Sequence, residues 1–134
     1  AAVGIEQLKK LTNLINIRRQ NHKFFFSLFK DDKRFIIQKF NKEHSCFAFT
    51  LIFRPKYKYI KKKVFAALKK NKIEFRLITG GSFFKHPVKK YFDYSKYNGS
   101  TMVDYVHENG FFIGNHPKNI KKELTFFKNI LQNI

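Results

Sequence analysis

The chain contains few of the residues that small proteins use to cross-link the fold, to fill its core or to end helices and strands. Its 134 residues include one cysteine, no tryptophan, three prolines and six glycines. With Cys46 alone we expect no intrachain disulfide and no Cys-based zinc site, and the scarcity of cysteine suits a reducing cytoplasm. There is also no charged-then-apolar leader pattern and no apolar run of transmembrane length. We therefore expect a soluble, cytoplasmic protein that does not bind a membrane.

Acidic residues are scarce too, since 9 Asp and Glu face 28 Lys and Arg and give a formal net charge of +19. Such an excess is typical of proteins that bind nucleic acid or another polyanion. The basic residues are nevertheless spread along the chain, mostly on the polar faces of expected helices, where charge usually serves solvation. Lys, Asn, Ile, Phe and Tyr are abundant together, which matches AT-rich codons. We attribute most of the charge to codon bias and keep a basic α/β module that binds RNA or another polyanion as the alternative function.

The remaining residues predict helices and short strands in alternation. Ile5, Leu8, Leu11 and Ile15 recur at helical spacing and indicate a helix over residues 1–22. The segment 24–29 either extends this helix or forms a second short turn, and residues 31–42, which lack a clear period, are expected to connect. Further along we expect these elements: strand 45–53, helix 57–71, strand 73–78, a short helix to Glu108, strand 111–113, and a last helix with Pro117 in its first turn.

Two of these helices carry clean apolar stripes. The stripe of helix 57–71 consists of Ile60, Val64, Phe65 and Leu68. The stripe of the last helix consists of Ile120, Leu124, Phe127, Leu131 and Ile134. Helices with one apolar face pack that face on a partner. The order therefore predicts an α/β architecture: a long N-terminal helix, then β-α-β-(α)-β-α, with helices packed on a small sheet.

Few patterns in the chain carry recognised chemistry. The five histidines are not paired at ligand spacing and no acidic cluster accompanies them, so we expect surface or loop histidines and no metal site. Cys46 lies in a predicted core strand and is expected to be an inert buried thiol. No Gly-x-Ser-x-Gly elbow occurs. The loop around Gly81 and Ser82 follows a strand but lacks the Gly-Lys-Ser/Thr of a phosphate loop.

Glu74 and Arg76 are the charged pair of greatest interest. They are two residues apart on a predicted strand and so share one face, while Ile73 and Phe75 take the other. A carboxylate and a guanidinium beside a Gly-rich loop could bind a phosphate or a sugar hydroxyl. A solvent-exposed ion pair on a sheet surface explains the same spacing equally well.

Several motifs in this order resemble one enzyme family. These motifs are the segments Ala1–Leu8, Arg18–Asn21, Cys46–Phe49, Ile73–Arg76, Tyr91–Ser95 and Asn109–His116. Together they resemble the C-terminal portion of the DegT/StrS family of pyridoxal-phosphate-dependent nucleotide-sugar aminotransferases and dehydratases. The last two segments are the most specific matches and favour the dehydratases.

The resemblance implies a fold-type-I enzyme that is a homodimer, acts on a nucleotide-sugar in lipopolysaccharide or O-antigen synthesis, and binds no nucleic acid. Residues 1–42 would connect to a large domain that holds pyridoxal phosphate, and residues 43–134 would form the small α/β domain that closes over the substrate. The resemblance implies that the catalytic Lys, or the His that replaces it, precedes Ala1. It also implies substrate-binding roles for these residues: Arg76, Glu74, Gly81, Ser82 and His116.

The same resemblance implies that the chain is a fragment, inactive by itself, with an exposed apolar face. The N-terminal helix and Phe24–Phe26 would rest on the large domain and the second subunit. We therefore expect this face to be solvent-exposed in the isolated chain.

Overall fold

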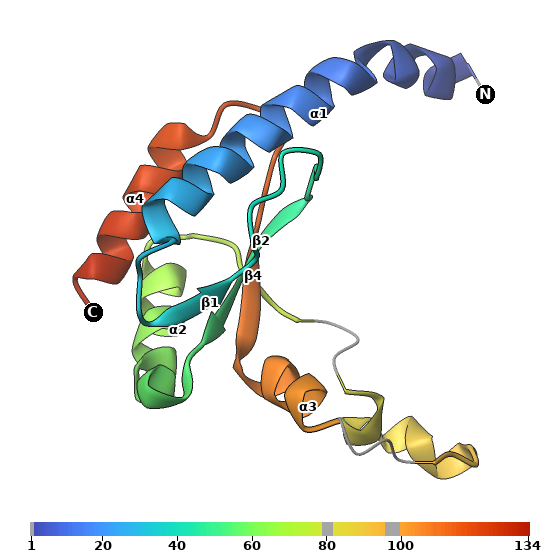
Figure 1. Ribbon diagram of the computed structural model, residues 1–134, viewed down its shortest axis with the longest axis vertical. Helices are drawn as coiled ribbons and strands as arrows, with labels where there is room; N and C mark the ends of the chain where they lie inside the picture. The colour runs from blue at the N-terminus through green and yellow to red at the C-terminus, as the bar shows by residue number, and fades with distance from the viewer. Residues whose placement is uncertain (1, 79–81, 96–99) are drawn as a thin grey trace.

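The described residues form a long helix, a small sheet, three further α-helices and short 3-10 helices (Figure 1). The computed structural model describes residues 2–78, 82–95 and 100–134. Its helices and strands are, in chain order, α1 (Ala2–Phe29), β1 (Phe35–Ile37), β2 (Ala48–Phe53), α2 (Lys61–Lys70), β3 (Arg76–Leu77), α3 (Ser100–Asn109), β4 (Gly110–Gly114) and α4 (Lys121–Gln132). Short 3-10 helices occur at Pro55–Ile60, Phe83–Lys85 and Pro87–Tyr91.

The sheet has four strands in the order β1-β2-β4-β3, and every neighbouring pair is antiparallel. This confirms the α/β architecture with helices packed on a small sheet. The segment 31–42, expected only to connect, contains β1, so that expectation was wrong. Three residues are too few to show a period, and β1 owes its form to pairing with β2, in which Phe35 lies opposite Phe53. The division of the chain at residue 42 stays a prediction.

The core lies between one face of this sheet and the helices α1, α2 and α4, and it is rich in phenylalanine. The ring of Phe25 on α1 stacks on Phe49 of β2 at 4.6 Å, and Phe53 stacks on Phe111 of β4 at 5.4 Å. Both predicted stripes face this core, with Val64 of α2 and Leu131 of α4 fully buried. Each such side chain contributes roughly 1.5–3 kcal/mol by leaving water.

Helix α1 has two unlike halves (Figure 1). Residues 2–13 are all exposed, including Ile5 and Leu8, whereas Phe25 and Phe29 are buried. The predicted exposed apolar face is therefore confirmed for the first half. It was wrong for Phe25, which packs in the chain's own core because the segment 24–29 continues the helix across the sheet.

The last helix begins at Lys121, four residues after Pro117, so the expected start was wrong. The side-chain amide of Asn21 donates to the carbonyl oxygens of His116 and Lys118 at 3.1 and 2.7 Å. These hydrogen bonds tie the segment after Pro117 to α1, and the His116 oxygen also accepts from the Lys118 amide in a tight turn at 2.8 Å. Asn119 then accepts a hydrogen bond from the Lys121 amide at 3.2 Å, which orders the real start.

The expected strand 73–78 is shorter than predicted, because only Arg76 and Leu77 pair with β4. The residues just before this strand cap the C-terminal end of α2, where the Ile73 amide donates to the Leu68 oxygen at 2.9 Å. Lys72 adopts a φ of 55° at this closure, in the conformation that usually follows a helix. Among residues 2–78, 82–95 and 100–134, no helix is both long and apolar enough to cross a membrane.

Candidate functional site

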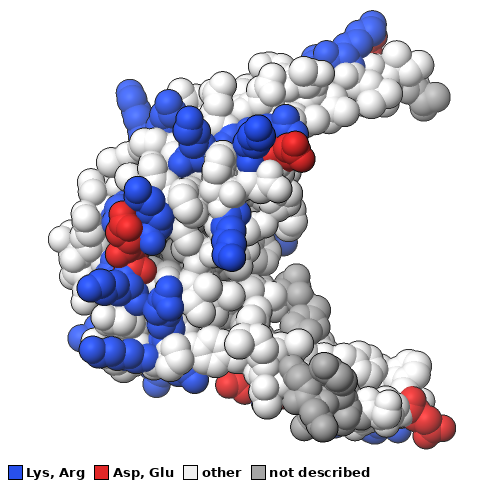
Figure 2. Space-filling view, viewed as in Figure 1, with Lys and Arg blue, Asp and Glu red and all other residues white. Residues whose placement is uncertain are grey.

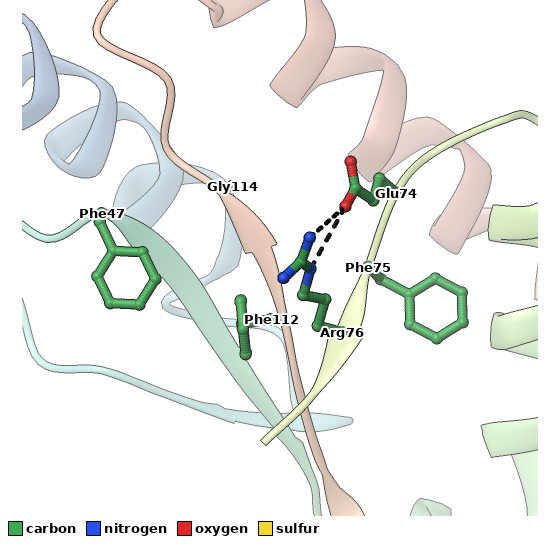
Figure 3. Close-up of a pocket in the computed structure, with 6 residues that line it drawn as sticks. All are labelled: Phe47, Glu74, Phe75, Arg76, Phe112 and Gly114. Carbon is green, nitrogen blue, oxygen red and sulfur yellow. Dashed lines mark hydrogen bonds and ion pairs between the residues drawn. The ribbon is translucent and has the colours of Figure 1, made fainter. Parts of the chain in front are cut away.

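Glu74 and Arg76 lie together on the face of the sheet that the core does not use (Figure 3). Two nitrogens of Arg76, Nε and an Nη, donate to Oε1 of Glu74 at 3.4 and 3.1 Å. Phe75, between them in sequence, points the other way and stacks on Phe65 of α2 at 4.7 Å. The predicted division of this segment into two faces is therefore confirmed.

The pair borders an open hollow of about 460 Å³. Phe47, Phe112 and Gly114 line it with Glu74, Phe75 and Arg76. Register explains why: Phe112 of β4 lies directly opposite Arg76 of β3, so both side chains stand on one face. The ring of Phe47 meets Phe112 edge to face at 6.1 Å. The hollow thus has one charged wall and one aromatic wall.

Of the other predicted substrate-binding residues, His116 lies near this hollow and Ser82 does not. Glu74 also borders a smaller neighbouring hollow of about 240 Å³, which His116 helps to line. The structure therefore brings Arg76, Glu74 and His116 into one region. Ser82 is fully buried, and its amide donates to Nδ1 of His107 on α3 at 3.3 Å, away from both hollows. Gly81 lies outside the described residues.

A buried amide pair, which the sequence did not single out, holds the end of β4 beside this region. Asn21 and Asn115 are each 1 % exposed, and the Asn21 amide donates to Oδ1 of Asn115 at 3.1 Å. The Asn115 side chain in turn donates to the oxygens of Arg18 and Cys46 at 3.1 and 2.9 Å. A buried, satisfied network of this kind fixes its neighbours, here the turn that carries Gly114 and His116.

Phe47 and Phe112 were also not predicted to line a site. The sequence does contain a signal for one of them, because two adjacent phenylalanines within a strand must point to opposite faces. The side chain of Phe111 is buried in the core, so the side chain of Phe112 points to the opposite face of the sheet, which borders the hollow. Phe47 precedes β2 and is 70 % exposed.

This arrangement can bind a phosphorylated, flat or hydroxyl-bearing ligand. The guanidinium of Arg76 presents paired donors that suit a phosphate, and Glu74 can accept from a sugar hydroxyl. The exposed faces of Phe47 and Phe112 offer stacking surface. The side chains of Arg76 and Glu74 are 69 % and 80 % exposed, so a ligand can reach both. The same exposure means that the pair adds little to folding.

Comparison with known proteins identifies the family. A model of the DegT/DnrJ/EryC1/StrS aminotransferase family matches residues 1–118. The chain belongs to this family. As a member, it is similar to the GDP-4-keto-6-deoxy-D-mannose 3-dehydratases of Escherichia coli O55:H7 and Yersinia pseudotuberculosis, with 37 % and 36 % identity over 132 residues. The match covers 98 % of this chain and 34 % of each relative, so the chain spans about one third of their length.

Solved structures agree with this placement in the DegT/DnrJ/EryC1/StrS family. The E. coli dehydratase with bound hydrated PLP matches 97 % of this chain and 34 % of its own, at a TM-score of 0.90 and 37 % identity. A dehydratase variant with bound GDP-perosamine matches equally well. Helicobacter pylori PseC, an aminotransferase, shares the fold at a TM-score of 0.76 and 15 % identity. The expected fold and family resemblance are confirmed.

The described lysines of this family member are not placed as a lysine that carries pyridoxal phosphate would be. A lysine that carries this cofactor needs a desolvated pocket. Among the described lysines none is buried, and none borders the hollow beside Arg76. Lys128, which is among the better shielded, is committed to Asp32 at 2.7 Å. The described part of the chain therefore offers no lysine suited to carry the cofactor.

Not every histidine lies at the surface as expected. His22 on α1 is 1 % exposed, and burial, together with the neighbouring His44, lowers its pKa. Cys46 is buried, as predicted, and burial raises the pKa of its thiol. Helical spacing alone could not show that α1 would turn His22 toward the sheet, because the face that packs is decided by the strands.

Proposed function

We propose that this chain is the substrate-closing part of a pyridoxal-phosphate-dependent nucleotide-sugar enzyme. The enzyme would be a 3-dehydratase or aminotransferase that acts on a 4-keto-6-deoxy-hexose nucleotide in lipopolysaccharide or O-antigen synthesis. The observation that carries the proposal is the exposed guanidinium of Arg76 beside an aromatic hollow, in a chain 37 % identical to GDP-sugar dehydratases.

In this proposal Arg76 binds the substrate through its phosphate or sugar, and Glu74 accepts from a sugar hydroxyl. His116 supports the closing turn, which the Asn21–Asn115 pair holds in place. Ser82 is buried beside His107, so Gly81 and Ser82 would lie near the substrate only if domain closure brings the substrate to them. The large domain would hold the cofactor, which would supply the electron sink for the sugar chemistry, in a cytoplasmic homodimer.

The alternative, a basic module that binds RNA or another polyanion, is not favoured. The view in Figure 2 shows Lys and Arg spread over several elements instead of gathered in one patch. The hollow beside Arg76 has a mixed-charge and aromatic lining, in contrast to the continuous basic groove that tracks a nucleic-acid backbone.

A binding experiment tests the proposal on the 134-residue chain. Amide resonances are followed by NMR during titration with GDP-mannose, a stable nucleotide-sugar. We expect shifts at Glu74, Arg76 and Phe112. Arg76→Ala should weaken binding about tenfold or more, because a hydrogen bond to a charged group contributes roughly 1.5–3 kcal/mol. Lys70→Ala is the matched control, since it removes one exposed positive charge at the end of α2.

The alternative function predicts the opposite result. In that case GDP-mannose leaves the spectrum unchanged, while a single-stranded RNA oligonucleotide binds with an affinity that falls steeply as salt rises. Equal losses from Arg76→Ala and Lys70→Ala would also contradict a specific role for Arg76.

The reading frame upstream of the Ala1 codon gives an independent test of the reaction. We expect it to encode a fold-type-I cofactor core. A lysine at the position that would carry the cofactor indicates an aminotransferase, and a histidine there indicates a dehydratase. A start codon beside Ala1 with no such core would contradict the enzyme proposal.

A further inference from the structure

Three potential metal ligands meet where α1 passes over the chain that leads into β2. The side chains of His22, His44 and Cys46 each offer one ligand atom, and these atoms all lie within 4.8 Å of one another. His22 comes from α1, and His44 and Cys46 come from the segment before β2, which runs beside that helix in Figure 1. The two histidine rings meet edge to face with centroids 6.2 Å apart.

One ring nitrogen in this cluster lacks a partner. Nδ1 of His22 is buried and has no hydrogen-bond partner among the residues that the structure describes. An unpaired buried polar group of this kind costs roughly 1–3 kcal/mol, so native proteins usually supply a partner for it. The rings of Phe40 and Phe49, whose centroids lie 5.5 and 6.3 Å from that of His22, offer no hydrogen-bond partner.

The backbone around the three side chains is held in place by other contacts. Arg19 on α1 donates to the oxygen of Glu43 at 2.6 Å, and Asn115 donates to the oxygen of Cys46 at 2.9 Å. The Asn115 amide also lies 3.8 Å from Sγ of Cys46, and the Gln38 amide lies 3.1 Å from Nδ1 of His44. A metal-binding histidine usually donates the N–H of its other ring nitrogen to a neighbouring acceptor. His44 Nδ1 can do so when the Gln38 side chain presents its amide oxygen.

We propose that His22, His44 and Cys46 form a binding site for a divalent metal ion of the zinc class. Two imidazoles and one thiolate are the donor set that such ions prefer, and no hard oxygen ligand is among them. Our expectation of no metal site and no Cys-based zinc site rested on sequence spacing and on a single cysteine. Spacing along the chain cannot show that α1 brings its histidine to the other two ligands.

The geometry needs only a small adjustment to bind the ion. Zinc bonds of about 2.0–2.3 Å place tetrahedral ligand atoms about 3.3–3.8 Å apart. His44 is exposed, so its side chain can rotate toward the two buried ligands. The exposed side also leaves a fourth position for water. The bound ion would fasten the segment before β2 to α1.

Cobalt(II) is the first probe, because a Co²⁺–thiolate bond gives a charge-transfer absorption band in the near ultraviolet. The reduced, metal-free 134-residue chain is titrated with Co²⁺ and then with Zn²⁺. We expect the absorbance of this band to rise until one equivalent of Co²⁺ has been added, and to disappear as Zn²⁺ displaces Co²⁺. Cys46→Ser should abolish the band. Saturating Zn²⁺ should raise the thermal unfolding midpoint, since a ligand that binds only the native state stabilises it.

A matched pair of histidine variants separates this site from chance binding. His44→Ala should weaken metal binding at least tenfold and remove the thermal shift, and its exposed position leaves the fold intact. His86→Ala, also at an exposed histidine, should change neither. The proposal is overturned if Co²⁺ gives no thiolate band, or if the two variants bind metal with equal affinity. In either case water would be the partner of His22.

Discussion

Two charged clusters in this molecule use the same kinds of residue for opposite purposes. In the first, Arg34 and Lys128 contact the carboxylate of Asp32 at 2.9 and 2.7 Å. The side chains of Asp32, Arg34 and Lys128 are 5 %, 18 % and 15 % exposed. In the second cluster, Arg76 contacts Glu74 at 3.1 Å, and both side chains are more than two-thirds exposed.

The comparison shows that burial, more than ion-pair geometry, separates a structural cluster from a candidate binding site. Asp32 joins the end of α1 to α4, and Lys128 also lies 4.5 Å above the ring of Phe29. The charged groups of this cluster already bind one another, so they are not available to bind a ligand. Arg76 keeps donors free for solvent, so it can exchange water for a phosphate at little cost to folding.

The largest expected effect comes from Asp32→Asn. This change leaves two shielded cations without their carboxylate, which typically costs roughly 3–5 kcal/mol when both partners are fully buried. Because Arg34 and Lys128 retain some exposure, we expect a loss of about 2–4 kcal/mol in the free energy of unfolding. Urea unfolding at pH 7 measures it. Asp31→Asn, at the adjacent exposed carboxylate, is the control and should change stability by less than about 0.5 kcal/mol.

Acid should weaken the buried cluster in a defined pH range. Burial alone would raise the pKa of Asp32, but hydrogen bonds from Arg34 and Lys128 outweigh it and hold the pKa well below its usual value. A carboxyl with a lowered native pKa stabilises the fold fully above its unfolded pKa of about 3.9, and loses that contribution as pH falls further.

Unfolding free energies measured between pH 5 and pH 2 should therefore fall more steeply for the natural chain than for Asp32→Asn. Asp31→Asn should follow the natural chain. Parallel curves for the natural chain and Asp32→Asn would show that the cluster does not lower the pKa of Asp32.

Much of the fold could be predicted because it depends on local patterns. The stripes of α2 and α4 follow from residues three and four apart, and β2 and β4 follow from runs of apolar and aromatic residues. What could not be predicted depends on contacts between distant segments. β1 exists through its pairing with Phe53 of β2, and α4 starts late because Asn21 binds the oxygens before it.

The candidate site likewise has features that the sequence predicts and features that depend on contacts between distant segments. The shared face of Glu74 and Arg76 follows from the two-residue period of a strand and was predicted. The aromatic wall made by Phe47 and Phe112 depends on the register between β2, β4 and β3, which one sequence does not reveal. The meeting of His22 with Cys46 likewise depends on how α1 crosses the sheet.

The smallest expected effect is the most direct test of the comparison. Arg76→Ala removes an exposed ion pair, so the free energy of unfolding should change by less than about 0.5 kcal/mol. Arg34→Ala removes the same side chain from the buried cluster and should cost about 2–3 kcal/mol, because Asp32 keeps Lys128 but loses two guanidinium hydrogen bonds, and the Leu131 oxygen loses one of its donors. Urea unfolding of both variants under one condition measures the difference. Should Arg76→Ala prove as costly as Arg34→Ala, the pair with Glu74 would be a structural element, and the case for Arg76 as a substrate-binding residue would lose its physical basis.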